Sequence, residues 1–279
     1  MKKLDRLVWA AGISFTSFGV RIGVRTSTTE LQEQILALLP AGWRLASSPV
    51  VERLYSVIAG GTPSRSYGRR FHLLYANVQR LARTENPDQL LEVLQSDLDT
   101  YIAQATRRWF FVHAGVVGWK RRAIVVPGRS LSGKTTLVKE FLHAGADYFS
   151  DEFAVLDASG RVHPFARPLS MRTDQSQSQG RMRITAGELG AEAGSEPLPV
   201  ALVVLTQYKP GAHWRPRVLS SGKGILGLLA NAIAARTQPE RALATLERMI
   251  RRAQVLESAR GEANEVVESI LQHLDGLIP

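Results

Sequence analysis

The sequence predicts an α/β protein in two parts: a small α/β domain over residues 1–106 and a larger domain over residues 107–279, with a mixed central sheet and C-terminal helices. Short runs of apolar residues, either alternating with polar ones or rich in β-branched side chains, predict strands. Stretches with apolar residues at helical spacing follow these runs and predict helices between the strands. A helix that starts at Asn86-Pro87, with proline at its first position, is expected to bridge the two parts. We therefore place the boundary near residue 106.

The first part combines strand and helix patterns. Apolar side chains alternate over residues 18–24, which predicts a half-buried strand, and residues 69–77 predict another. Ser27 and Glu30 have the spacing of a capping box at the start of a helix. The apolar face of that helix carries Leu31, Ile35, Leu38 and Leu39. Nothing before residue 106 has catalytic spacing, so we expect a packing or substrate-presenting domain.

The second part is richer in strands and ends in helices. Strands are expected over residues 109–117, 121–127, 147–157 and 199–208. The polar segment 174–198 is expected to form a mobile loop. Helices are expected around 224–235, after the Thr237–Glu240 stretch, and in the last residues, with Val267, Ile270, Leu271 and Leu274 on one face.

Composition narrows the classes of partner and site. There are 35 Lys and Arg against 25 Asp and Glu, a net charge of +10, which attracts acidic partners without choosing among them. The chain has no cysteine, which excludes disulfides, thiolate metal sites and cysteine nucleophiles. No apolar run approaches the roughly 18 residues of a membrane helix, so no membrane partner is expected. Lys2 and Lys3 precede a short apolar stretch, but Asp5 and Arg6 interrupt it, and a first strand is expected there rather than a secretion signal.

Residues 128–136, "GRSLSGKTT", match the phosphate-binding pattern G-x-x-x-x-G-K-[ST]. The β-branched run 123–126 before the loop suits a buried strand, and the apolar spacing after it suits a helix that ends at Gly145. Strand, glycine loop and helix therefore follow in the order that a P-loop requires. The sequence predicts a nucleotide site formed by Gly128, Ser130, Ser132, Gly133, Lys134, Thr135 and Thr136.

The residue types in the loop indicate the ligands. Successive backbone N–H groups and the helix N-terminus attract anionic oxygens. Lys134 is expected to bridge the β- and γ-phosphates of ATP, and the Thr135 hydroxyl to bind Mg²⁺. ATP and Mg²⁺ are therefore the expected ligands, and an ATP-using motif favours a cytoplasmic location.

Asp151 and Glu152 are candidates for the carboxylates that such a site needs for metal binding and proton transfer. Neighbouring residues of a regular strand face opposite sides, so only a strand end or a bulge would direct both toward the phosphates. Asp151 follows a small serine and aromatic residues and is the preferred functional acid. The alternative is a solvated acid pair at the end of a strand.

A histidine and an arginine complete the candidate set. His113 lies in the apolar strand "FFVHAGVV", where a histidine with a purely structural role in the core is the alternative. Arg172, preferred to Arg167, is a candidate for stabilising charge near the γ-phosphate, and two solvated loop arginines are the alternative.

The stretch "VHAGVVGWKRRAIVVPGRSLSGKTTLVKEFLHAGADYFSDEFAVL" resembles the catalytic domain of HPr kinase/phosphorylase and the related P-loop kinases. The resemblance implies an HPr-kinase-type domain in which His113 partners the catalytic acid, Asp151 is the base, and Glu152 is linked to Mg²⁺. The bacterial HPr kinases have aspartate at the position of Glu152 and serine at that of Thr135. Their downstream glycine- and arginine-rich signature is replaced by "PFARPLSMR". The chain looks more like the divergent relatives associated with peptide modification, such as lasso-peptide precursor kinases.

The sequence thus predicts a serine kinase-like enzyme that transfers the γ-phosphate of ATP to a hydroxyl of a peptide or small protein. One alternative is a kinase of free serine or a similar metabolite. Another is a nucleotide-gated binding module that uses the basic groups 107–108 and 120–122. Nucleic acid is not indicated, because no aromatic stacking platform lies among the basic residues. The sequence does not determine the oligomeric state and is compatible with a homo-oligomer.

Overall fold

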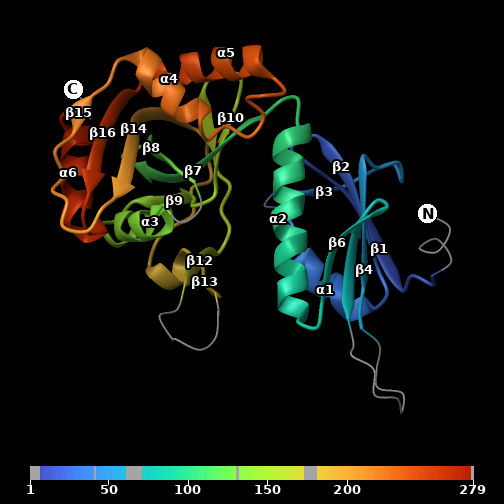
Figure 1. The fold of residues 1–279 in the computed structure, drawn as a ribbon. Coiled ribbons are helices and arrows are strands. Elements are labelled where there is room, and N and C mark those ends of the chain that lie inside the picture. The colour runs from blue at the N-terminus through green and yellow to red at the C-terminus, as the bar shows by residue number, and fades with distance from the viewer. Residues whose placement is uncertain (1–6, 41, 61–70, 130–131, 173–180, 278–279) are drawn as a thin grey trace. The chain divides into compact units, whose positions relative to one another are not determined.

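The structure, a computed structural model, describes residues 7–40, 42–60, 71–129, 132–172 and 181–277. The chain divides into two compact units, residues 1–107 and 108–279, next to the boundary expected at residue 106. Each unit is a mixed α/β structure (Figure 1).

Unit 1 is built on a six-stranded sheet in the order β3-β1-β2-β4-β5-β6. Its strands are β1 (Ala11–Ser17), β2 (Val20–Thr26), β3 (Arg44–Leu45), β4 (Arg53–Ile58), β5 (His72–Ala76) and β6 (Gln79–Thr84). The β2–β4 pair is parallel, because α1 (Thr29–Leu36) forms the crossover between these strands. The helix α2 (Pro87–Ala105) packs on β5 and β6.

The helix starts of unit 1 follow local capping chemistry. Asn86 caps α2, and its side chain accepts hydrogen bonds from the backbone N–H groups of Asp88 and Gln89, as the Asn86-Pro87 pair predicts. The capping box expected at Ser27 is wrong by one position. Thr28 caps α1 by accepting from Leu31 N, while Ser27 Oγ accepts from Ala59 N at 2.8 Å.

Unit 2 is built on an eight-stranded sheet in the order β11-β10-β7-β8-β14-β16-β15, with β9 also paired to β7. Its strands are β7 (Phe110–Trp119), β8 (Arg122–Pro127), β9 (Asp147–Ser150), β10 (Phe153–Leu156), β11 (Arg161–His163), β14 (Leu198–Tyr208), β15 (Arg217–Val218) and β16 (Gln254–Arg260). The neighbouring strands β8, β14 and β16 are parallel. Their carboxyl ends therefore lie along one edge, where α/β sheets bind ligands.

Helices cover both faces of this sheet (Figure 1). Ile124 and Val126 of β8 belong to a core cluster with residues of α3 (Lys134–His143) and α6 (Ala263–Asp275). Ala123 and Val125 belong to a second cluster with residues of α4 (Ser221–Leu229) and α5 (Pro239–Ile250). The strand before the glycine loop is thus buried on both sides, which fixes where the loop begins.

Three expectations for unit 2 need correction. The strand over residues 147–157 is two strands, β9 and β10, separated by a bend. The helix around 224–235 ends at Leu229, and β16 was not expected. The expected loop 174–198 contains β13 (Arg181–Ile184), paired with β12 (Leu169–Arg172), and the 3-10 helix η2 (Gly187–Leu189). Residues 173–180 lie outside the described part.

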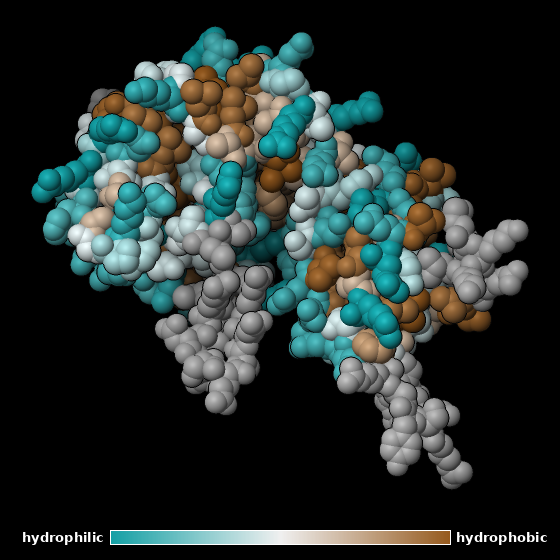
Figure 2. All heavy atoms as spheres, viewed as in Figure 1, coloured by the Kyte–Doolittle hydropathy of each residue, from teal (hydrophilic) through white to brown (hydrophobic). Residues whose placement is uncertain are grey.

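The surface of unit 2 carries both hydrophobic and hydrophilic side chains. Figure 2 shows hydrophobic patches over α4 and α5 among hydrophilic side chains, and the exposed large apolar residues include Leu226 and Leu243. Across the described ranges, the structure contains no helix with the length and apolar character needed to span a bilayer.

Candidate active site

The glycine loop lies between the buried strand β8 and the helix α3, the context that a P-loop requires. Gly133 caps α3 with φ +82°, in the left-handed region that favours glycine, and no side chain caps this helix start. A Cβ at Gly128 would lie 2.6 Å from Ser132 Oγ, so this position also has no room for a side chain. The first turn of α3 therefore presents backbone N–H groups to an anion. Ser130 lies outside the described residues, and Thr136 is exposed on α3.

Lys134 is 7% exposed, and its Nζ donates a hydrogen bond to the carbonyl of Arg129 at 2.9 Å. Burial lowers the pKa of Lys134, while the nearby carboxylates of Glu152 and Asp151 act in the opposite direction. The ammonium group thus folds back over the loop, close to both acids.

The two acids occupy a bend between β9 and β10. Both strands pair antiparallel with β7, where Ser150 lies opposite Val116 and Phe153 opposite His113, and Ala114 N donates a hydrogen bond to the Glu152 carbonyl at 3.1 Å. Ser150 Oγ accepts hydrogen bonds from the backbone N–H groups of Glu152, at 3.1 Å, and Phe153, at 2.9 Å. Both acid side chains lie close enough to Lys134 for their charges to raise its pKa, against the effect of burial.

Asp151 is 7% exposed and lies against the start of α3. Its carboxylate accepts hydrogen bonds from Thr135 Oγ1 at 3.2 Å and from the Tyr148 hydroxyl at 3.0 Å. Burial raises the pKa of Asp151, and the hydrogen bond from Tyr148 partly offsets this effect.

Tyr148 was not recognised from the sequence. Its hydroxyl is 3.0 Å from Asp151 Oδ1 and 2.8 Å from the carbonyl oxygen of Arg167. A phenol has one proton to donate, and the carbonyl can only accept. The single phenolic proton is therefore shared between these two acceptors, and its donation to Asp151 favours the carboxylate, against the effect of burial.

The side chain of Glu152 contacts His113 on β7. His113 Nε2 lies 3.1 Å from Glu152 Oε1, and the side chain of Glu152 is half-exposed. Burial opposes the ionisation of Glu152, but the hydrogen bond from His113 and the charges of His113, Lys134 and Arg167 lower its pKa overall. His113 therefore partners Glu152 and not Asp151, the acid that the resemblance assigned to it.

The two candidate arginines differ in what the structure describes. The sequence favours Arg172 over Arg167 as the arginine near the γ-phosphate. In the structure, Arg167 is among the charges that lower the pKa of Glu152. Arg172 ends β12, and its side chain lies outside the described part.

Arg260, at the end of β16, is a second residue that was missed. It is 2% exposed, and its guanidinium donates hydrogen bonds to the carbonyls of Gly133, at 2.9 Å, and Gly261, at 3.0 Å. A Cβ at Gly133 would lie 2.5 Å from Arg260 Nη2. Arg260 thus holds the end of the glycine loop from a strand two places away in the sheet.

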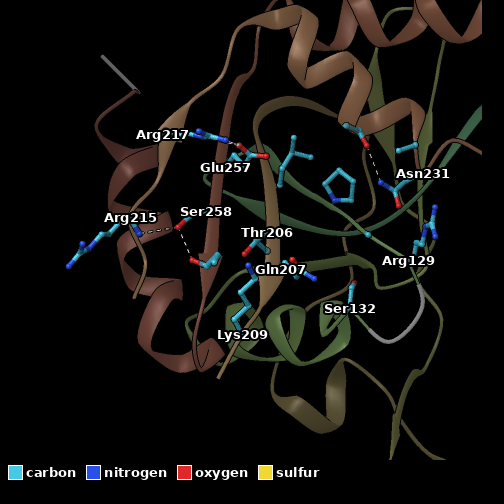
Figure 3. Close-up of a pocket in the computed structure, with 16 residues that line it drawn as sticks. Arg129, Ser132, Thr206, Gln207, Lys209, Arg215, Arg217, Asn231, Glu257 and Ser258 are labelled. Atoms are coloured by element: carbon cyan, nitrogen blue, oxygen red, sulfur yellow. Dashed lines mark hydrogen bonds and ion pairs between the residues drawn. The ribbon is translucent and has the colours of Figure 1, made fainter. Parts of the chain in front are cut away.

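A groove of about 720 Å³ opens beside the glycine loop (Figure 3). It is lined by loop residues, by the ends of β14 and β16, and by the C-terminal part of α4. Four of its side chains are cationic, namely Arg129, Lys209, Arg215 and Arg217, and one, Glu257, is acidic.

No protein-family model matches the chain, and no curated protein matches it.

Proposed function

We propose that the chain is an ATP-dependent kinase that transfers a phosphoryl group to a hydroxyl of a peptide or protein. One observation carries the proposal: a bend after β9 brings two carboxylates beside the lysine and threonine of a P-loop, with Thr135 Oγ1 3.2 Å from Asp151. A P-loop kinase needs both an acid near its metal ion and a proton acceptor, and these residues supply the two.

The residues of the loop fit Mg-ATP. The uncapped start of α3 and the ammonium of Lys134 favour phosphate oxygens, and Thr135 with a neighbouring carboxylate offers the oxygen ligands that Mg²⁺ prefers. The described residues include no cluster of three or more His, Asp and Glu that could hold a metal ion. A site with one or two carboxylates suits Mg²⁺, which takes its other ligands from phosphates and water. When bound, the metal ion neutralises charge on the transferring phosphate.

Asp151 is the proposed proton acceptor, because it is buried directly beside the loop and is held by Thr135 and Tyr148. Glu152, oriented by His113, is proposed to help Thr135 hold Mg²⁺. Arg167 and Arg172 would add positive charge near the transferring group.

We also propose that unit 2 is a domain of HPr-kinase type. Support comes from the order of its elements: a strand with His113, a P-loop, a helix, and an acid pair whose flanking strands both pair with the histidine strand.

The test is transfer of label from γ-labelled ATP with Mg²⁺ to a size-fractionated extract of the source cell. The wild type is compared with Lys134→Ala and with Lys139→Ala, a control on the same helix. We expect label in peptide or protein fractions with the wild type and the control, and none with Lys134→Ala. Label only in the low-mass fraction would indicate a metabolite kinase. Equal traces for all three proteins would refute transfer and favour a nucleotide-gated binding module.

A second comparison separates the roles of the acids. Asp151→Asn is expected to reduce transfer by about 10²- to 10⁴-fold, the usual contribution of a general base, with little change in ATP binding. Glu152→Gln is expected to raise the Mg²⁺ concentration needed for half-maximal rate. If ATP affinity fell as far as the rate in Asp151→Asn, Asp151 would have a metal-binding or structural role instead.

A further inference from the structure

The cationic groove beside the P-loop carries an inference about the acceptor, which rests on the proposed function for its role in transfer. Its lining runs from Gly128 and Arg129, after β8, across β14 and β16 to Arg217 on β15 (Figure 3). One end of the groove is therefore formed by the loop that would hold the phosphates.

The charges in the groove are unbalanced. Arg217 Nε donates to Glu257 at 2.8 Å, so these two side chains neutralise each other. Arg129, Lys209 and Arg215 are exposed and form no ion pair with the other described residues. Three positive charges on residues that line the groove thus have no ion-pair partner among the described residues, and a ligand with negative charges would complement them.

The width of the groove favours an extended chain over a single small molecule. Its walls span three inter-strand spacings, from β8 to β15, and each spacing is about 4.8 Å, which gives a width of about 14 Å. An extended peptide covers about 3.3–3.6 Å per residue, so about four residues would cross the groove. A free amino acid would occupy about a quarter of this width.

The lining also argues against the adenosine part of ATP. Among the described residues that line the groove, none is aromatic, and most of the side chains are polar or charged. Nucleoside pockets rely mainly on apolar and aromatic surface with few polar groups.

We propose that this groove binds an acidic peptide segment, and that Lys209 and Arg215 hold acidic side chains of the acceptor within about four residues of the hydroxyl that receives the phosphate.

The experiment uses the full chain and two fluorescein-labelled heptapeptides, one with a central serine flanked by glutamates and one with lysines in their place. Binding is measured by anisotropy in low and in 0.5 M salt, with and without ADP. The variants are Lys209→Glu/Arg215→Glu and, as a control, Arg252→Glu, an exposed arginine outside the groove.

We expect the wild type and Arg252→Glu to bind the acidic peptide at least tenfold more tightly than the basic one, and high salt to weaken this preference. The groove variant should lose at least tenfold in affinity for the acidic peptide while its ATP binding is unchanged. Absence of a preference in the wild type, or equal losses in the two variants, would overturn the proposal.

Transfer measured with γ-labelled ATP on the same peptides and on L-serine separates this proposal from the kinase assignment. A charge-dependent complex without transfer would support the groove and refute the kinase. Transfer to the peptides that ignores their charge would support the kinase and refute the groove, and transfer to L-serine alone at equal rates in all variants would refute the groove and indicate a metabolite kinase.

Discussion

Gly133→Ala tests the arrangement of the loop most directly, because two separate costs can be assigned to it. Alanine at φ +82° occupies the left-handed region, at a cost of about 1 to 2 kcal/mol. The new Cβ would lie 2.5 Å from Arg260 Nη2, and the buried guanidinium can move away only by giving up its hydrogen bond to the Gly133 carbonyl. A hydrogen bond from a charged group contributes about 1.5 to 3 kcal/mol. The expected loss in the free energy of unfolding is therefore about 2.5 to 5 kcal/mol.

Gly145→Ala is the matched control, because Gly145 has φ +90° in the same unit but no atom within 4 Å of its added Cβ. It should cost only the backbone contribution of about 1 to 2 kcal/mol. Urea unfolding of the nucleotide-free proteins gives both values. Titration with a fluorescent ATP analogue should show at least a tenfold loss of affinity for Gly133→Ala and little change for Gly145→Ala.

Two results would refute this reasoning. One is equal destabilisation by the two substitutions, since the contact with Arg260 would then contribute nothing. The other is additivity in a double-mutant cycle of Gly133→Ala with Arg260→Ala, because residues in contact should show an interaction energy of at least about 0.5 kcal/mol.

Three further substitutions test the bend that carries the two acids. Burial raises the pKa of Asp151, so ionisation of this carboxyl group destabilises the folded protein as the pH rises through that pKa. Asp151→Asn should therefore raise the melting temperature of the metal-free protein at pH 7.5, by about 2–4 °C for each kcal/mol of stability regained. The gain should vanish below about pH 4, where an aspartate is protonated in the folded and the unfolded chain alike. Ser150→Ala leaves the N–H groups of Glu152 and Phe153 without their acceptor and should cost about 1 to 3 kcal/mol in urea unfolding. Tyr148→Phe removes the hydrogen bond that lowers the pKa of Asp151, so the rise of the transfer rate with pH should move to higher pH.

The features that the sequence predicted well are local ones. The P-loop is contiguous in the chain, and a β-branched run before it and helical spacing after it indicate the strand and the helix that the structure contains. The start of α2 depends on Asn86 and Pro87, which are adjacent to the turn they cap. In each case the residues that determine the structure lie within a few positions of it.

The features that were missed depend on pairing between distant segments. Residues 254–260 were not recognised as a strand, and Arg260 reaches Gly133, 127 positions earlier, only because β14 brings β16 near β8. The partner of His113 likewise depends on the register between β7 and β10, which places Phe153 opposite His113 and Glu152 beside it. No pattern within a short window contains this register.

The bend at residues 151–152 explains how consecutive residues can have different chemistry. In an unbroken strand, Asp151 and Glu152 would face opposite sides of the sheet, and one of them would point away from the loop. Because the chain bends at Ser150, Asp151 turns into the buried space between Thr135 and Tyr148, while Glu152 meets the half-buried His113 at the rim. The first environment favours the neutral form of a carboxyl group and the second favours the ionised form. One bend thus gives the same loop a carboxyl group able to take up a proton and another that keeps its charge, which is the combination that the proposed phosphoryl transfer would use.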